Sequence, residues 1–164
     1  EACAKFIGPD ADLYFNQVVI KPPEKGRHFA WHQDSGYVET KPLAYITCWT
    51  AIGDTTLDNG CIWVVPRSHK LGLLPHPRDM VENMLVAQAD ESQAIPVPMK
   101  AGQVAIFSSL TLHKSGPNTS QTIRRGYVPQ YHVPGVIGVR NNQLFGDQYP
   151  VLRGGQKVAY EYTG

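Results

Sequence analysis

The sequence predicts an all-β fold of the jelly-roll type with few short helices. Glycine and proline are frequent and evenly spread, at 15 and 13 of the 164 residues, so they cut the chain into short segments. Between them lie runs rich in valine, isoleucine, threonine, tyrosine and tryptophan, which are typical of strands. Many short strands separated by turn signals indicate a sandwich or barrel.

Six runs are strand-like: 13–20, 43–51, 61–66, 95–99, 103–107 and 125–133. Asn59-Gly60 is a turn signal directly before the third run. The best short helix candidate is 81–87, with a lid or connector as the alternative. We expect one domain over residues 1–164, with a core at about 13–133. The polar, glycine-rich tail 138–164 is expected to wrap the surface or to cover a pocket mouth.

The charge balance excludes some classes of partner. The formal net charge is +1, and the basic residues form no run, so nothing indicates nucleic acid or an anionic membrane. No apolar stretch approaches the length of a membrane-spanning helix. The N-terminal residues 1–5 do not form a secretory signal, and the expected location is the cytoplasm.

The three cysteines, Cys3, Cys48 and Cys61, lack the spacing of a metal site. Cys48 and Cys61 lie in apolar strand-like runs, which favours buried thiols in a reducing compartment. A disulfide between these two is the alternative.

The main chemical signal is a pair of distant fragments, His32-Gln33-Asp34 and His113. The pattern His-x-Asp…His is the ligand set of a facial triad, which holds non-haem ferrous iron and leaves coordination positions open. Two residues apart in an extended segment, His32 and Asp34 would project from the same face. The alternative is that the pattern arises by chance, because His-x-Asp is common. A lone histidine is more often a hydrogen-bonded structural residue than a metal ligand.

Arg124 follows His113 by eleven residues. Its planar guanidinium could hold the distal carboxylate of a diacid such as 2-oxoglutarate with two parallel hydrogen bonds. Arg125 is its neighbour, and on a strand the two point to opposite faces, so only one can enter a pocket. The spacing from His113 favours Arg124.

Several ordered blocks make the chain resemble the phytanoyl-CoA dioxygenase family of iron- and 2-oxoglutarate-dependent oxygenases. The resemblance covers about residues 17–132. The blocks, in order, are Lys21-Pro22-Pro23, Trp31-His32-Gln33-Asp34, Cys48-Trp49-Thr50-Ala51, Asp58-Asn59-Gly60-Cys61, Val65-Pro66-Arg67-Ser68-His69-Lys70 and His113-Lys114-Ser115-Gly116-Pro117-Asn118 leading to Arg124.

The resemblance implies a double-stranded β-helix, in agreement with the jelly roll. It implies Fe(II) bound by His32, Asp34 and His113. It also implies 2-oxoglutarate as cosubstrate. The residues implied to contact it are Arg124, Gln17, Trp49 and Ser115. Only thirty-one residues precede His32, fewer than relatives usually have, so the chain is either a fragment or a reduced version.

Other residues are weighed against structural roles. His28, Trp31 and Tyr37 flank the metal motif and are candidates for substrate contact, with core packing as the alternative for the aromatic pair. His69 is expected to fix the turn after a strand. His76 and His132 have no partner signal and are expected to be structural or exposed.

The function implied is a dioxygenase that hydroxylates a small organic molecule with O2 while 2-oxoglutarate is converted to succinate and CO2. The carboxylate of Asp34 favours hydroxylation over halogenation, because related halogenases lack that ligand. Desaturation or cyclisation would use the same ligands. The alternative function, from a different class, is a metal-binding, cupin-like isomerase or binding protein without oxygenase activity. Such a protein would have no use for Arg124 and Gln17. The primary substrate and the oligomeric state stay open.

Overall fold

The computed structural model describes residues 2, 4–23, 27–43, 45–146 and 148–160. Two α-helices are short, α1 (Ala4–Ile7) and α2 (Asp34–Tyr37), and two 3-10 helices are η1 (Ser68–Leu71) and η2 (Glu91–Gln93). The strands are β1 (Ala11–Lys21), β2 (Phe29–His32), β3 (Thr40–Lys41), β4 (Ile46–Ala51), β5 (Ile62–Val64), β6 (Arg78–Asp79), β7 (Met84–Leu85), β8 (Ile95–Val97), β9 (Val104–Ser108), β10 (His113–Ser115), β11 (Arg124–His132), β12 (Ile137–Gly138), β13 (Gln143–Leu144), β14 (Tyr149–Arg153) and β15 (Gln156–Lys157).

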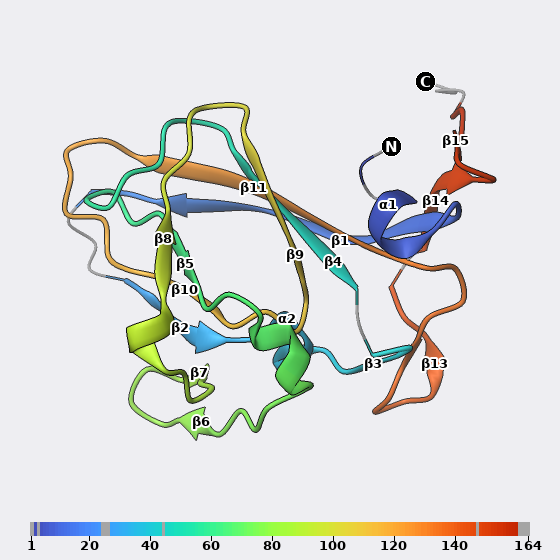
Figure 1. The fold of residues 1–164 in the computed structure, drawn as a ribbon, viewed down its shortest axis with the longest axis horizontal. Helices are drawn as coiled ribbons and strands as arrows, with labels where there is room; N and C mark the ends of the chain where they lie inside the picture. Colours follow the sequence, from blue (N-terminus) through green and yellow to red (C-terminus); the bar gives the residue numbers. More distant parts are fainter. Residues whose placement is uncertain (1, 3, 24–26, 44, 147, 161–164) are drawn as a thin grey trace.

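Two antiparallel sheets form the body of the fold (Figure 1). The larger has the order β15-β14-β1-β11-β4-β9, and the smaller has the order β2-β10-β5-β8. Neighbours are distant in sequence, as when Gln17 of β1 pairs with Val128 of β11. Residues from both sheets line one cavity between them. The predicted double-stranded β-helix is confirmed.

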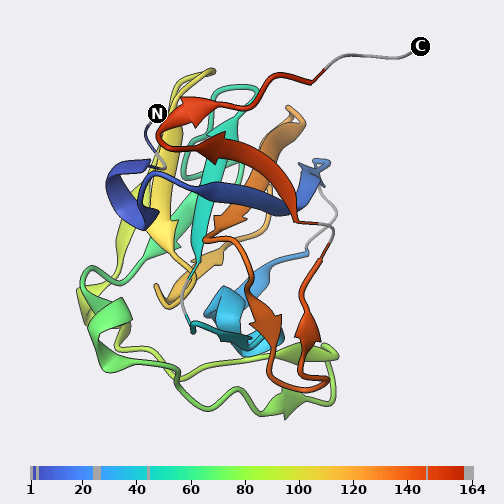
Figure 2. The same cartoon turned by 90° about the vertical axis from the view of Figure 1, so that its right-hand side faces the viewer.

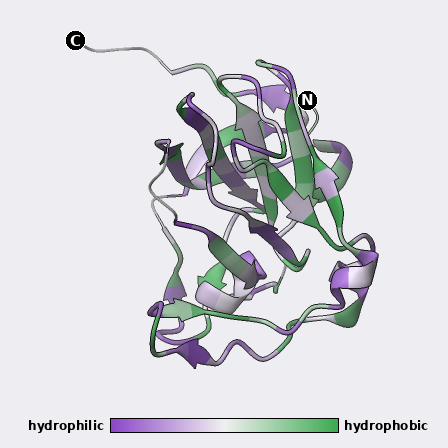
Figure 3. Ribbon diagram, turned by 90° about the vertical axis from the view of Figure 1, so that its left-hand side faces the viewer, coloured by the Kyte–Doolittle hydropathy of each residue, from purple (hydrophilic) through white to green (hydrophobic). Residues whose placement is uncertain are grey.

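Each of the six predicted runs contains a strand: β1, β4, β5, β8, β9 and β11. Hydrophobic and hydrophilic residues alternate along several strands (Figure 3), as expected when one face covers a core. Strand β4 differs because it is buried on both faces. Ala44, inside the predicted run 43–51, lies outside the described residues.

The predicted helix at 81–87 is wrong. The segment is a turn followed by β7, which pairs with β6 in a hairpin. The Asp79 carboxylate accepts hydrogen bonds from the backbone N–H groups of Val81 and Glu82, which fixes a turn instead of a helical start. Asn83 then takes a positive φ of 53°, which a helix excludes. Val81 is 92% exposed, so no apolar stripe favours a helix here.

The tail after residue 138 contributes strands instead of a loose wrap. Strands β14 and β15 extend the larger sheet beside β1 (Figure 2), while β13 and β12 form a small sheet with β3. Phe145, between β13 and β14, packs against Tyr14 with ring centroids 4.9 Å apart and lines a cavity. The tail therefore belongs to the folded body and to one wall of a pocket.

Two apolar clusters stabilise the smaller sheet from both sides. Trp49, Ile62 and Val128 belong to a cluster that joins the two sheets, while Trp31 and Leu112 belong to a second cluster. Cys48 and Cys61 are buried thiols outside any disulfide, and Cys3 lies outside the described residues. In the described part of the chain, no helix has the length and apolar character needed to cross a membrane.

Candidate metal centre and cosubstrate pocket

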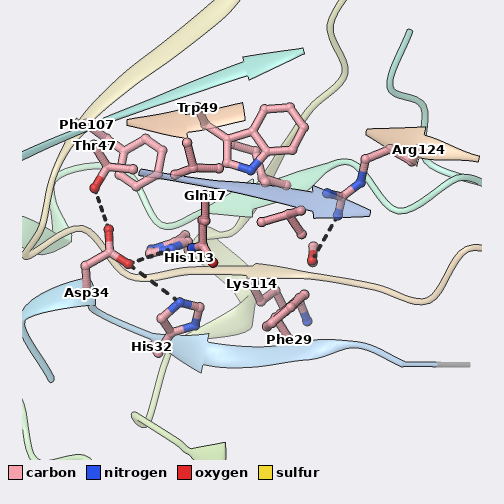
Figure 4. A pocket seen from close by; sticks show the side chains of 14 residues that line it. Gln17, Phe29, His32, Asp34, Thr47, Trp49, Phe107, His113, Lys114 and Arg124 are labelled. Atoms are coloured by element: carbon pink, nitrogen blue, oxygen red, sulfur yellow. Dashed lines mark hydrogen bonds and ion pairs between the residues drawn. The ribbon is translucent and has the colours of Figure 1, made fainter. Parts of the chain in front are cut away.

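Three side chains converge between the sheets, and each lies at the end of a strand or at the start of a helix. His32 ends β2, Asp34 begins α2, and His113 begins β10, directly opposite His32 in the antiparallel pair. Asp34 Oδ1 lies 3.8 Å from His32 Nε2 and 3.6 Å from His113 Nε2. The three candidate ligand atoms all lie within 4.8 Å of one another, a spacing that suits one metal ion. Figure 4 shows both rings directed at the Asp34 carboxylate.

The two histidines are held in the same orientation. Nδ1 of His32 lies 2.7 Å from the Ala30 carbonyl oxygen, and Nδ1 of His113 lies 2.9 Å from that of Thr111. A carbonyl can only accept, so each Nδ1 donates, and each Nε2 keeps its lone pair for a metal. Burial, and next the nearby His113, lower the pKa of His32 to about 4. His32 is therefore neutral at neutral pH, as a metal ligand must be.

The third ligand is fixed through one of its two oxygens. Asp34 Oδ2 accepts hydrogen bonds from Thr47 Oγ1 at 2.5 Å and from Gln130 Nε2 at 2.9 Å. Gln130 Nε2 also lies 3.0 Å from Thr47 Oγ1, and its Oε1 accepts from the Tyr14 hydroxyl at 2.7 Å. This network occupies Oδ2 and leaves Oδ1 directed at the two histidines.

The middle residue of the motif holds the turn in place. Gln33 is fully buried, and its side chain donates to the carbonyls of Gly72 and Leu110 and accepts from the Leu74 N–H. Its backbone N–H donates to His76 Nε2 over 2.9 Å. A Cβ on Gly36 would lie 2.4 Å from the His76 ring, so this ring packs closely on the backbone after Asp34. The metal motif is thus anchored from behind.

Arg124 is a buried cation with a free donor. Its side chain is 1% exposed, and Nε and Nη2 donate to the Gly60 carbonyl over 3.2 and 3.0 Å. Nη2 also lies 3.4 Å from Ser115 Oγ, while Nη1 has no partner among the described residues. Burial lowers the pKa of Arg124 to about 10, so it is charged at neutral pH. An unpaired buried cation is costly, which favours an anionic ligand at Nη1.

One cavity joins the triad to Arg124. It has a volume of about 100 Å³, and His32, Asp34 and His113 lie toward one end, with Arg124 toward the other (Figure 4). Its remaining lining includes all three of the other predicted cosubstrate contacts, Gln17, Trp49 and Ser115. The apolar walls come from Val19, Ile62, Phe107 and Val128.

A second cavity of about 500 Å³ adjoins the triad. It shares Gln17, Phe29, His32 and Asp34 with the first cavity, so the metal motif forms part of both walls. Tyr37 lines it, with its ring edge against His32 at a centroid distance of 5.5 Å. The site therefore has one compartment on the Arg124 side and a larger one beside it. We call these the inner cavity and the outer cavity.

Two predicted substrate residues do not reach either cavity. Trp31 precedes His32 on β2 and so points to the opposite face. It is buried in the second apolar cluster, where Nε1 donates to Glu91 over 2.9 Å. His28 is exposed and is not among the residues that line the two cavities. Of the three candidates, only Tyr37 faces the outer cavity.

The sequence alone did not indicate four residues that support the candidate ligands: Tyr14, Gln33, Thr47 and Gln130. His76, which was expected to be structural or exposed, has a structural role behind the motif. Two of the four carried a usable signal. Thr47 lies two residues before Trp49 on β4, and Gln130 lies six after Arg124 on β11. Even spacing on a strand puts such residues on one face.

Among the described residues, the candidate metal cluster does not include His69, His76 or His132. His132 is fully buried and stacks on Tyr14.

Comparison with known proteins shows the family of the chain. The sequence model of the family "Phytanoyl-CoA dioxygenase (PhyH)" matches residues 2–126. The peroxisomal phytanoyl-CoA dioxygenase of Homo sapiens is 30% identical over 131 residues, which cover 73% of this chain and 39% of that protein. Methylphosphonate hydroxylase of Gimesia maris is 35% identical over 127 residues, which cover 76% of this chain and 46% of that protein.

Among solved structures, the apo form of the non-heme monooxygenase ThoJ superposes with a TM-score of 0.73 at 29% identity, covering 90% of this chain and 61% of that one. Its nickel complex gives 0.68 at 30% identity, covering 84% and 50%. The chain spans less than half of the length of the two curated relatives.

A double-stranded β-helix with a His-x-Asp…His cluster between its sheets defines the class of non-haem iron, 2-oxoglutarate-dependent oxygenases. Within that class the chain belongs to the phytanoyl-CoA dioxygenase (PhyH) family.

Proposed function

We propose that this protein is an Fe(II)- and 2-oxoglutarate-dependent dioxygenase that hydroxylates a small organic molecule. His32, Asp34 and His113 hold the iron, and Arg124 binds the distal carboxylate of 2-oxoglutarate. One observation carries the proposal. The three ligand atoms lie within 4.8 Å of one another in the same cavity into which the buried Arg124 projects with an unpartnered Nη1.

When bound, ferrous iron and 2-oxoglutarate supply the oxidative chemistry: the keto acid and O2 give succinate and CO2, and one oxygen atom passes to the substrate. The chain's own residues bind and orient the reactants. Arg124 fixes the far end of the diacid, with Ser115 Oγ beside it as a further donor. Apolar walls at Val19, Ile62 and Val128 keep water from the buried charge.

Asp34 bears on the reaction type. Its Oδ2 is held by Thr47 and Gln130, so Oδ1 serves as the carboxylate ligand. A triad with this third ligand favours hydroxylation over halogenation. Desaturation and cyclisation use the same ligands and are alternatives that product analysis separates.

The relatives support the metal and offer first substrates. The non-heme monooxygenase ThoJ has a nickel complex, and nickel, like ferrous iron, binds nitrogen and oxygen ligands. The names of two relatives contain phytanoyl-CoA and methylphosphonate, which makes these two compounds rational first substrates to test.

We propose a reducing compartment such as the cytoplasm, because Cys48 and Cys61 are buried and outside any disulfide. The human relative is peroxisomal by name.

A second candidate function is a metal-binding, cupin-like isomerase or binding protein without oxygenase activity. It would need the triad but not a buried cation in the same cavity. Arg124 therefore distinguishes the two candidates, since only a diacid cosubstrate has a use for it.

Anaerobic addition of ferrous iron and then 2-oxoglutarate tests the proposal. We expect a weak visible charge-transfer band, followed by succinate release when oxygen is admitted. Arg124→Ala should bind iron but lack the band at the same 2-oxoglutarate concentration, and Arg125→Ala should keep it. Folded, iron-loaded protein that shows neither the band nor succinate would favour the isomerase or binding protein.

A further inference from the structure

The charges around the triad are divided between its two cavities. Arg124 lines the inner cavity, so its charge lies on the side assigned to the diacid. Lys114 also lines this cavity, but its Nζ donates to Glu91 over 2.9 Å and lies over the Trp31 ring, so its charge is already paired. In the described part of the chain, no lysine or arginine lines the outer cavity. The histidine and the carboxylate that line it, His32 and Asp34, both belong to the triad. A ligand in the outer cavity would therefore meet no lysine or arginine among the described lining residues.

The outer cavity is instead lined by aromatic rings. Six of its thirteen lining residues are aromatic: Tyr14, Phe15, Phe29, Tyr37, Tyr45 and Phe145. Three of them, Phe15, Phe29 and Tyr37, are 44–45% exposed although large aromatic side chains are usually buried. Exposed apolar surface gathered around a concave site indicates a ligand that covers it.

Apart from the Asp34 carboxylate of the triad, the polar groups that line the outer cavity are neutral. Burial raises the pKa of Tyr14 and of Tyr45 well above the usual tyrosine value, so both phenols keep their protons. Asn83 Oδ1 accepts from Arg78, which leaves its amide N–H groups for a ligand. The side-chain amide of Gln17 has no partner in the described part of the chain. Two neutral amides suit the hydroxyl or carbonyl oxygens of a ligand.

We propose that the primary substrate is an uncharged ring compound bearing hydroxyl or carbonyl groups, bound in the outer cavity against Asp34 and His32. The proposal rests on the proposed function, because it takes the inner cavity as the place of 2-oxoglutarate. Apart from the metal held at the triad, an anion in the outer cavity would lose its hydration without gaining a cation from the described lining residues.

The hairpin of β6 and β7 supplies the wall that selects the substrate. Met84 and Asn83 line the outer cavity from this hairpin. The Tyr37 hydroxyl donates to the Leu85 carbonyl and accepts from its N–H, both over 3.3 Å, so it ties the hairpin to α2 directly behind Asp34. Met84 is therefore positioned as a specificity-determining residue. Met80, on the same hairpin, is 82% exposed and is not part of the lining.

The test compares matched neutral and anionic probes. Protein loaded with Ni(II) and 2-oxoglutarate is titrated by calorimetry with oestrone and oestrone 3-sulfate, and with 1-naphthol and 1-naphthyl sulfate. We expect the neutral member of at least one pair to bind about tenfold or more tightly than its sulfate, since the sulfate is desolvated without a partner. Met84→Arg should narrow or reverse that ratio, and Met80→Arg should leave it unchanged.

One further variant and one control measurement complete the test. Arg78 is the cation of the hairpin and donates to Asn83 Oδ1, so Arg78→Gln should change the affinity of a neutral probe and its sulfate only together and leave their ratio unchanged. Sulfates that bind as tightly as the parent alcohols, a ratio that depends on Arg78, or no binding by any member of both pairs would overturn the proposal. The 2-oxoglutarate charge-transfer band of the iron-loaded protein is recorded separately. If the band is present, such results count against the substrate class; if it is absent, the proposed function itself has failed.

Discussion

Gln130 on β11 donates a hydrogen bond from Nε2 to Oδ2 of Asp34 over 2.9 Å, across 96 residues of sequence. Its carboxamide oxygen in turn accepts from the Tyr14 hydroxyl, so its orientation is fixed. Together with Thr47, this amide leaves only Oδ1 of Asp34 for a metal. The carboxylate ligand is thus held by three strands of the larger sheet.

Removing that amide should weaken metal binding without touching a ligand. Gln130→Leu is expected to raise the metal dissociation constant by about 10- to 100-fold, the usual effect of losing a group that orients a ligand. Competition with a chelator measures it. Gln143→Leu, on an exposed edge strand, is the matched control. Equal metal affinity in both variants would mean that Gln130 does not position Asp34.

His113→Ala should abolish iron retention while the fold survives. The ring lines the inner cavity, and its loss removes one of the three candidate ligands. Metal content as purified and circular dichroism provide the two measurements. His69→Ala, at an exposed position on η1, should keep its iron. Turnover of 2-oxoglutarate by the His113 variant at the wild-type rate would refute the triad.

The sequence located the candidate ligands because their signals are local. His32 and Asp34 are two residues apart, and the neighbours Arg124 and Arg125 differ in burial as strand alternation requires, the first buried and the second exposed. The support for Asp34 could not be found in the same way, since it depends on strand pairing between distant segments.

Two incorrect predictions, a helix at 81–87 and a pocket position for Trp31, also have physical causes. The segment 81–87 has helix-forming residues, but an aspartate turn and the Tyr37 hydroxyl hold it in a hairpin. Trp31 is next to His32 in the sequence, which suggests a place in the pocket, but adjacent residues on a strand point to opposite faces.

Gly126 should be required for the position of Trp49. A Cβ at Gly126 would lie 2.3 Å from Trp49 Cζ2, so Gly126→Ala must displace the indole that packs 5.1 Å from the Arg124 guanidinium. We expect a loss of about 1–3 kcal/mol in the free energy of unfolding, as for other overpacked cores, together with weaker 2-oxoglutarate binding. Chemical denaturation and anaerobic titration measure these. Gly53→Ala, which meets open space, should be nearly neutral; a Gly126 variant as mild as that would show that Trp49 yields easily.

Lys21 should make stability depend on pH. Its side chain is 4% exposed, and Nζ donates to the carbonyls of Ser115 and Gly116. Burial, and next the charge of Arg124, lower its pKa to about 7. An unfolded lysine titrates near pH ~10.4. Between these values the unfolded chain binds a proton that the folded chain lacks, so stability should rise with pH above about 7.

Lys21→Met removes the contribution of Lys21 to the pH dependence of stability. The free energy of unfolding of the wild type, relative to the variant, should therefore increase from pH 7 to pH 9 by at most about 1.4 kcal/mol per pH unit. Lys70→Met, at an exposed position, controls for the loss of a lysine. A difference that stays constant or shrinks with rising pH would show that Lys21 is fully charged in the folded protein over this range.

Arg124→Ala should separate cosubstrate binding from metal binding. Iron should stay, because no ligand is touched, while the affinity for 2-oxoglutarate should fall by about one to three orders of magnitude. A charge-assisted bond to a carboxylate contributes about 1.5–3 kcal/mol, and more when the carboxylate is left buried without a partner. Arg124→Lys should recover only part of this, because an ammonium cannot form the two parallel bonds of the guanidinium.

Arg125→Ala is the matched control, since this neighbour is exposed on the other face of β11. Its effect on 2-oxoglutarate binding should be small. Anaerobic titration of 2-oxoglutarate into each iron-loaded variant, followed by the visible absorbance change, gives the three affinities. If Arg125→Ala weakened binding more than Arg124→Ala did, the anchor would have to be reassigned. The unpartnered Nη1 of Arg124 would then need another ligand, because a buried cation without an anion is not stable at this depth.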